Sequence, residues 1–389
     1  MSKSQSAPDD QGLHQFIRQE IEKSGPISCE RFFELVLYHP RWGYYSQDRA
    51  RVGRHGDFIT NVSVGEMFGS ILAEQIAELW ELAGSPAEFA IVEPGAESGD
   101  LAADIVSSLG KEYPEVPLKY FILEPHPDKQ AHQQKRLTGV SVQWISNWEK
   151  LGLFNGIVLA NEFLDALPCR VVEFSDNQWK EICIGLEGEA FAFRPGSIIN
   201  PSLAAEIAKL PAMPFQPYRT EINLAARNWV NAAAKRLGCG YLLFIDYGYA
   251  KTEYYSPLRT EGTLTGYRAQ QRDNNVLERI GETDITAHVD FTAIAEAALE
   301  AGCRVIGFTD QHHFMVGAGE RRLLSMEADP GRTPVRQREK FLRAYKTLMH
   351  PETMGLAFKY LLLGKGLPDQ RVPSGFRYAG DPKKALELP

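Results

Sequence analysis

Short apolar runs alternate with amphipathic segments along the middle of the chain. Each run holds about five residues, and several of them end in an acidic or amide side chain. Continuous apolar runs of this length between helices are typical of buried parallel strands in βαβ units. Right-handed crossovers would then place helices on both faces of one sheet. The pattern predicts an α/β fold with a mostly parallel twisted sheet, whose strands fall at residues 89–93, 119–124, 140–145, 156–160 and 241–245.

An N-terminal helical extension and a β-meander are predicted outside this alternation. Apolar residues at helical spacing indicate helices at 13–23 and 65–82. Three short runs separated by polar turns, between residues 171 and 193, indicate the meander. A helix at about 221–237 and a last strand at 358–363 complete the pattern.

These elements predict one large domain with insertions between two terminal tails. We treat the meander as an insertion within the sheet domain. The predicted segments are a disordered tail at 1–12, an N-terminal helical region with a cofactor-contacting loop at 13–82, a sheet domain at 83–367 with insertions at about 170–220 and 251–283 and a helical accessory at about 320–350, and a C-terminal tail at 368–389.

The composition narrows the function classes. A net charge of -8 argues against a nucleic-acid binder that follows phosphates and favours a basic protein segment as partner. Five scattered cysteines without a C-x-x-C pair predict neither a zinc site nor a disulfide framework. His312 and His313 are expected on a strand, where they would point to opposite faces and share no metal. The polar N-terminus and the lack of an apolar run of ~20 residues predict a cytoplasmic protein without membrane insertion. The sequence allows an oligomer.

Polar side chains follow several of the predicted strands. Glu93, Glu124, the pair Asn161 and Glu162, and Asp246 all come directly after apolar runs. In open α/β sheets the ligand lies at the carboxyl ends of the strands. We therefore expect these side chains to meet at one edge of the sheet.

The loop after the first of these strands reads E-P-G-A-E-S-G from Glu93 to Gly99. Its glycines, Gly95 and Gly99, permit a close approach of the backbone to a ligand. The loop opens with an acid and lacks a third glycine, so it is a poor cradle for pyrophosphate but tolerates the positive charges of S-adenosylmethionine (SAM). Glu124 after the next strand suits the ribose diol of such a cofactor. An ordinary strand-to-helix turn and a dinucleotide site remain alternatives.

Two further motifs could contribute to this site. Residues 53–60 read G-R-H-G-D-F-I-T, which could wrap the amino-acid end of a ligand or form a surface turn that caps the next helix. Residues 160–168 read A-N-E-F-L-D-A-L-P and place Asn161, Glu162 and Asp165 after a buried strand. These three groups could bind a cationic nucleophile, or their acids could offset the macrodipole of a helix N-terminus.

Taken together, these motifs resemble one family. G-D-F-I-T at 56–60, E-x-G-x-x-x-G-x-L at 93–101, N-E-F-L-D-A-L-P at 161–168, D-Y-G at 246–248 and D-I-T-A-H-V-D-F at 284–291 occur in the order seen in the MidA-type methyltransferases. Y-H-P-R-W-G-Y-Y at 38–45 is similar as well. The resemblance covers about residues 27–363. The family includes the mitochondrial complex I assembly-factor arginine methyltransferase and its bacterial relatives.

The resemblance implies a class I SAM-dependent methyltransferase fold, which is Rossmann-like, with an insertion. The implied activity is methylation of a protein side chain, most of all arginine, with a role in the assembly of a respiratory complex. Glu162, with Asp165 or Asp246 as helper, is expected to orient a guanidinium for direct methyl transfer. The implied cofactor contacts fall on Gly56, Asp57, Phe58, Thr60, Glu93, Gly95, Gly99, Glu124, Asn161 and Glu162.

This chain departs from the family pattern in the glycine loop. The family usually has Glu-Leu-Gly-Pro-Gly-x-Gly, whereas Pro94, Ala96 and Glu97 stand here in place of leucine, proline and the middle glycine. A side chain at Glu97 costs about 1 kcal/mol if the position needs a positive φ, so cofactor affinity could fall or the loop could shift. Asn161 stands where relatives often have histidine. Two rival hypotheses are a catalytically inert SAM-fold binding protein or assembly chaperone and a nicotinamide-dependent oxidoreductase.

Overall fold

The computed structural model describes residues 10–47, 60–268, 270–328, 334–368 and 371–389. The chain divides into two compact units. We call them the meander unit, drawn from residues 1–59, 165–227 and 252–288, and the parallel-sheet unit, drawn from residues 60–164, 228–251 and 289–389. The meander unit thus joins the predicted N-terminal region to both predicted insertions, although these segments lie far apart in the sequence.

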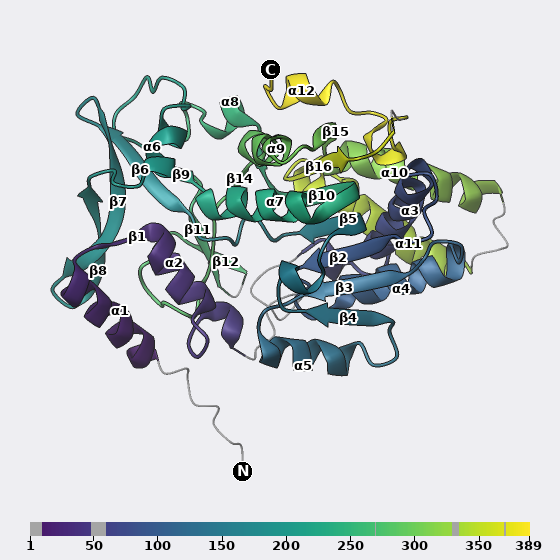
Figure 1. Cartoon of the computed structure of the whole chain (residues 1–389), viewed down its shortest axis with the longest axis horizontal. Coiled ribbons are helices and arrows are strands. Elements are labelled where there is room, and N and C mark those ends of the chain that lie inside the picture. The colour runs from purple at the N-terminus through teal and green to yellow at the C-terminus, as the bar shows by residue number, and fades with distance from the viewer. Residues whose placement is uncertain (1–9, 48–59, 269, 329–333, 369–370) are drawn as a thin grey trace, which may run out of the picture. The chain divides into compact units, whose positions relative to one another are not determined.

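The parallel-sheet unit is built on one long sheet with the strand order β15-β16-β10-β5-β2-β3-β4 (Figure 1). The neighbours from β10 to β4 pair in parallel, whereas β16 is antiparallel to both β10 and β15. The strands are β2 (Ala90–Pro94), β3 (Lys119–Leu123), β4 (Val142–Ile145), β5 (Phe154–Asn161), β10 (Leu237–Tyr249), β15 (Arg304–Asp310) and β16 (Phe358–Lys365), with the short β14 (Val289–Asp290) beside β10. The mostly parallel sheet that the apolar runs predicted is confirmed.

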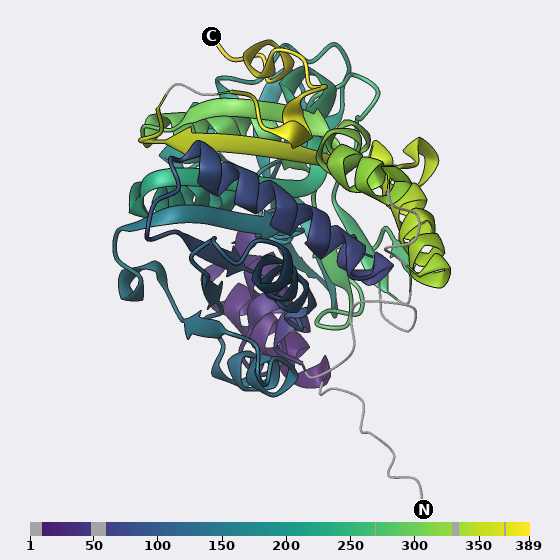
Figure 2. The same cartoon turned by 90° about the vertical axis from the view of Figure 1, so that its right-hand side faces the viewer.

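Helices cover both faces of this sheet because its central strands are apolar on both sides. Ile157 and Leu243 share one buried cluster with Ile71 of α3 (Figure 2). On the other side of β10, Phe244 lies 6.5 Å from Trp229 of α7, measured between ring centroids. The helices are α3 (Met67–Leu82), α4 (Asp100–Glu112), α5 (Pro127–Arg136), α7 (Leu224–Arg236), α9 (Phe291–Glu300), α10 (Gln311–Ala328), α11 (Val335–Met349) and α12 (Pro382–Ala385), with shorter turns η2 (Val62–Val64), η3 (Trp148–Lys150), η4 (Pro351–Gly355) and η5 (Ser374–Phe376).

The meander unit holds an antiparallel sheet of the order β1-β7-β6-β9, with β8 paired to β7. Its buried cluster joins Phe32 of α2 to Val171 and Ile184 of the sheet. The elements are α1 (Asp10–Ser24), β1 (Ile27–Ser28), α2 (Cys29–Tyr38), η1 (Tyr44–Ser46), β6 (Arg170–Ser175), β7 (Gln178–Glu187), β8 (Ala190–Gly196), α6 (Pro201–Ile207), β9 (Tyr218–Ile222), α8 (Lys251–Tyr254), β11 (Thr265–Arg268), β12 (Gln271–Asp273) and β13 (Asp284–Thr286). The predicted meander is therefore present, and its sheet also contains the N-terminal strand β1.

The strand predicted at His312 and His313 is wrong, because both residues lie in the first turn of α10. His312 Nδ1 lies 2.9 Å from the Met349 carbonyl oxygen, and His313 Nδ1 lies 2.7 Å from Asp310 Oδ1. No group of three or more potential metal ligands occurs among the described residues. Within the same part of the chain, no helix has both the length and the apolar character needed to cross a membrane.

Candidate functional site

The carboxyl ends of four neighbouring strands bring the predicted polar side chains to one edge of the parallel sheet. Glu93 lies near the end of β2, Glu124 follows β3, Asn161 ends β5 and Asp246 lies near the end of β10 (Figure 1). Ile245 pairs with Asn161, so Asp246 follows directly after the residue that faces the end of β5. All four strands are adjacent in the order β10-β5-β2-β3. This edge is where the sequence placed the ligand.

Glu124 is held so that one carboxylate oxygen stays available. The residue is 4% exposed, and its backbone N–H donates to the Ile145 carbonyl over 3.0 Å. Oε1 accepts the backbone N–H of His126 over 3.0 Å. Oε2 accepts no hydrogen bond from any described residue. An oriented carboxylate with one oxygen left over fits a ligand that donates hydroxyl groups.

The glycine loop adopts the left-handed turns that its glycines permit. Gly95 has φ 66° and Gly99 has φ 86°. A Cβ atom at Gly95 would lie 2.9 Å from Cδ2 of Phe163, so a larger residue would also collide. Glu97 has φ 47°, which shows that the side chain is accommodated in a strained backbone conformation.

Glu97 is held in this conformation by α5. Gln133 Nε2 donates to the Glu97 carbonyl oxygen over 2.9 Å. Lys129 Nζ lies 3.6 Å from Glu97 Oε2 and offsets its negative charge. Glu97 thus follows the turn that the family's glycine would make, at the cost of backbone strain.

Glu93 is almost completely buried near the end of β2. It is 3% exposed, and the Tyr120 hydroxyl donates to its Oε2 over 2.8 Å. Burial raises the pKa of Glu93 to about 7, against the opposing effect of the tyrosine hydrogen bond. Burial thus favours the neutral form of this carboxyl group, and Tyr120 fixes its position.

Glu162 is fixed at this edge by its backbone conformation and by hydrogen bonds to one of its carboxylate oxygens. It has φ 49°, and its backbone N–H donates to the Ile245 carbonyl over 2.9 Å. Its Oε1 accepts the backbone N–H of Asn61 over 3.1 Å and the side-chain Nδ2 of Asn161 over 3.2 Å. Burial raises the pKa of Glu162 to about 8, and the nearby Asp246 carboxylate adds to the rise. The carboxyl group is thus mostly neutral at pH 7 until a cation approaches.

Asp246 positions the loop that carries Glu162. It is 1% exposed, and its Oδ2 accepts the backbone N–H groups of Phe163 and Leu164 over 3.1 and 2.8 Å. Oδ1 accepts the backbone N–H of Tyr247 over 2.8 Å. Because both oxygens bind the protein's own backbone, the contacts of Asp246 indicate a positioning residue.

The structure describes two of the remaining predicted residues, Asp165 and Thr60. Asp165 belongs to the meander unit, where its carbonyl accepts the N–H of Ala287 over 3.0 Å. Thr60 is buried, and its hydroxyl accepts the N–H of Ser63 over 3.2 Å at the start of η2. Gly56, Asp57 and Phe58 lie outside the described residues.

Sequence reasoning missed Asn61. The residue is fully buried, and neither its Oδ1 nor its Nδ2 has a hydrogen-bond partner among the described residues. Its backbone N–H nonetheless contacts Glu162. The one signal in the sequence was its position directly after the G-D-F-I-T motif.

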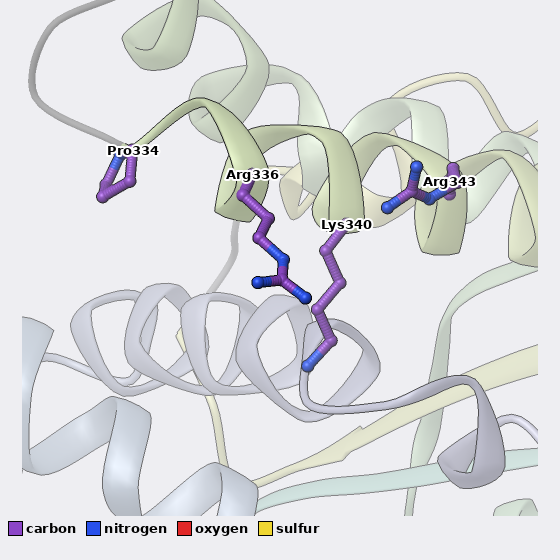
Figure 3. A pocket seen from close by; sticks show the side chains of 4 residues that line it. All are labelled: Pro334, Arg336, Lys340 and Arg343. Carbon is purple, nitrogen blue, oxygen red and sulfur yellow. The ribbon is translucent and has the colours of Figure 1, made fainter.

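A cavity of about 440 Å³ lies along α11 and is lined by Pro334, Arg336, Lys340 and Arg343. Figure 3 shows the side chains of Arg336 and Lys340 extending from the helix. Three cations would repel a sulfonium ion. This cavity is therefore a poor site for SAM, in contrast to the acidic strand edge.

Residues 71–309 match the model of a family described as "Putative S-adenosyl-L-methionine-dependent methyltransferase". The match spans more than half of the chain. The chain belongs to this methyltransferase family.

Solved structures agree with this assignment. A Burkholderia thailandensis protein solved with S-adenosyl-homocysteine bound is 30% identical with a TM-score of 0.86, and the match covers 97% of this chain and 98% of that chain. A native structure from the same organism has a TM-score of 0.84 at 30% identity, with the same coverage. The predicted class I methyltransferase fold is confirmed.

Curated relatives are more distant in sequence, and their matches also cover most of both chains. "Protein arginine methyltransferase NDUFAF7, mitochondrial" from Xenopus laevis is 26% identical over 88% of this chain and 82% of its own length. The human protein of the same name is 24% identical over 92% of this chain and 83% of its own. The family match and the solved structure with S-adenosyl-homocysteine show that this methyltransferase uses SAM, and the free oxygen of Glu124 fits the ribose of that cofactor.

Proposed function

We propose that this methyltransferase transfers the methyl group of SAM to an arginine side chain of a protein. The printed names of the curated relatives support this substrate. The structural observation that carries the proposal is Glu162, a partly buried acid whose Oε1 is anchored by two N–H groups. An anchored carboxylate is suited to a guanidinium, which offers paired N–H donors.

The residues of the edge have separate tasks in this scheme. Glu124 Oε2 would accept hydrogen bonds from the ribose hydroxyls, and the backbone around Gly95 would hold the amino-acid end of the cofactor. When bound, SAM would supply an electrophilic methyl carbon on a positively charged sulfur. Glu162 would hold and orient the guanidinium for attack, and such alignment lowers the barrier.

Glu162 also suits proton removal. Arginine does not lose a proton in water at neutral pH, so the proton leaves as the new bond forms or afterwards. Burial raises the pKa of Glu162, the approaching guanidinium favours its ionised form, and a carboxylate with a raised pKa is the stronger base. Glu162 Oε2 accepts no hydrogen bond from any described residue and is the atom that we assign to receive the proton.

We further propose that the enzyme acts in the cytoplasm.

The net charge of the chain bears on the substrate. A net charge of -8 favours a basic protein segment as substrate over a nucleic acid. A role in the assembly of a respiratory complex stays a prediction from the family resemblance.

Labelled methyl transfer tests the proposal. Wild-type enzyme is incubated with methyl-labelled SAM and a cellular protein fraction, and the labelled residue is identified by mass spectrometry. We expect label on arginine, a loss of at least about 100-fold in Glu162→Gln with cofactor affinity retained, and no change in the exposed control Glu115→Gln. Label on another residue type, or none despite cofactor binding, would contradict the proposal. Full activity of Glu162→Gln would remove Glu162 from the scheme.

A further inference from the structure

Three polar atoms beside Glu162 are buried and lack a partner. They are Oδ1 and Nδ2 of Asn61 and Oδ1 of Asn161. Asn61 is fully buried, whereas Asn161 is partly buried. Roughly 90% or more of buried polar groups in proteins have a hydrogen-bond partner, so three unpartnered atoms at one place indicate a binding position.

The atoms that hold Glu162 orient these two amides. Asn61 reaches Glu162 Oε1 through its backbone N–H, over 3.1 Å, which leaves its whole side-chain amide unpaired. Asn161 reaches the same oxygen through Nδ2, over 3.2 Å, which leaves its Oδ1 unpaired. Glu162 Oε2 accepts no hydrogen bond from a described residue. Four polar atoms at this place therefore lack a partner among the described residues. Three are acceptors, namely Asn61 Oδ1, Asn161 Oδ1 and Glu162 Oε2, and one is a donor, Asn61 Nδ2.

A donor-rich cation matches this set. A guanidinium carries five N–H donors in a plane and no acceptor, whereas an ammonium carries three donors around a single atom. The cofactor's own ammonium group also carries three donors, so the affinity for S-adenosyl-homocysteine is measured beside that for the arginine probe below. The single donor, Asn61 Nδ2, can pair with a carbonyl of the peptide that carries the guanidinium.

We propose that Asn61 and Asn161 bind N–H groups of the arginine guanidinium and, together with Glu162, select arginine over lysine. The inference rests on the proposed function, since it names residues that recognise the same substrate. It adds Asn61, a position that the family motifs did not assign, to the substrate contacts.

Binding of N-acetyl-arginine amide to the full-length enzyme, saturated with S-adenosyl-homocysteine, tests the inference by calorimetry. We expect the wild type to bind this probe and to bind the neutral N-acetyl-citrulline amide at least about tenfold more weakly. N-acetyl-lysine amide should bind at an intermediate level. Equal binding of the arginine and lysine probes would overturn the selection that we assign.

The matched variants are Asn61→Leu and, at an exposed position, Asn274→Leu. Asn61→Leu should weaken the arginine probe by about tenfold or more and change the affinity for S-adenosyl-homocysteine by less than about threefold. Asn274→Leu should leave both affinities unchanged. If Asn61→Leu fails to fold, Asn61→Ser, which is smaller and polar, should show the same selective loss.

With the Asn61 variant, two further results would overturn the inference. One is wild-type affinity of the folded Asn61 variant for the arginine probe. The other is a loss confined to S-adenosyl-homocysteine, which would place Asn61 at the cofactor. Failure of the proposed function looks different, because the wild type itself would then not bind the arginine probe.

Discussion

At the scale of single residues, the site depends on backbone conformations that cost energy. Glu97 and Glu162 both have positive φ, at 47° and 49°. Non-glycine residues in this region persist where the surroundings fix them, and such residues gather at functional sites. The sequence predicted Glu162 as a site residue, but it could not predict that Asn61 would be buried against it, since burial depends on the folded chain.

The raised pKa of Glu162 predicts a pH dependence for arginine binding. The ionised carboxylate attracts the guanidinium, and with a pKa of about 8 the group is mostly protonated below pH 8. Affinity for N-acetyl-arginine amide should therefore rise as the pH is raised from 6 to 8, by up to about tenfold per pH unit. Calorimetry across this pH range measures the affinity. A flat profile in the wild type, or a retained slope in Glu162→Gln, would contradict the assignment.

At the scale of elements, the strands that a local sequence pattern defines could be predicted, whereas a pairing between distant segments could not. Strands β5 and β10 each contain a continuous apolar run, at residues 156–160 and 241–245, so these runs alone indicated buried parallel strands. The pairing of β1 with β7 joins residues that lie far apart in the sequence, and no local pattern signals it. His312 and His313 were misassigned because β15 ends at Asp310, just before them.

The turn between β5 and its loop depends on Asp246 of β10. In Asp246→Asn the backbone N–H groups of Phe163 and Leu164 lose a charged acceptor, which should lower the free energy of unfolding by about 1–3 kcal/mol. Loss of the negative charge should also lower the pKa of Glu162, so the rise of arginine binding moves to lower pH. Denaturant unfolding and the pH profile check both effects.

The exposed Asp128→Asn serves as a control and should change neither quantity. A merely structural role for Asp246 would reduce stability and leave the pH profile in place. That outcome would separate Asp246 from the electrostatics of Glu162.

At the scale of the whole molecule, the predicted site residues that carry the account belong to one unit. Glu93, Gly95, Glu124 and Glu162 all lie in the parallel-sheet unit. Saturation with S-adenosyl-homocysteine should therefore slow amide hydrogen exchange around residues 93–99, 124–126 and 161–164. The β7–β8 hairpin of the meander unit should exchange unchanged. Protection confined to that hairpin would place the cofactor elsewhere.

The cationic cavity along α11 supplies an internal control for this placement. Lys340→Ala should leave the affinity for SAM within about twofold of the wild type, since three cations disfavour a sulfonium in this cavity. Glu124→Ala should weaken it by at least about tenfold through loss of the charged acceptor.

A crystal structure of this enzyme with S-adenosyl-homocysteine would test the central claim most directly. We expect the ribose hydroxyls at about 2.5–3.0 Å from the Glu124 carboxylate, with the amino-acid end beside Gly95. A nucleoside bound away from the carboxyl ends of β2 and β3, with Glu124 making no contact to it, would contradict the account.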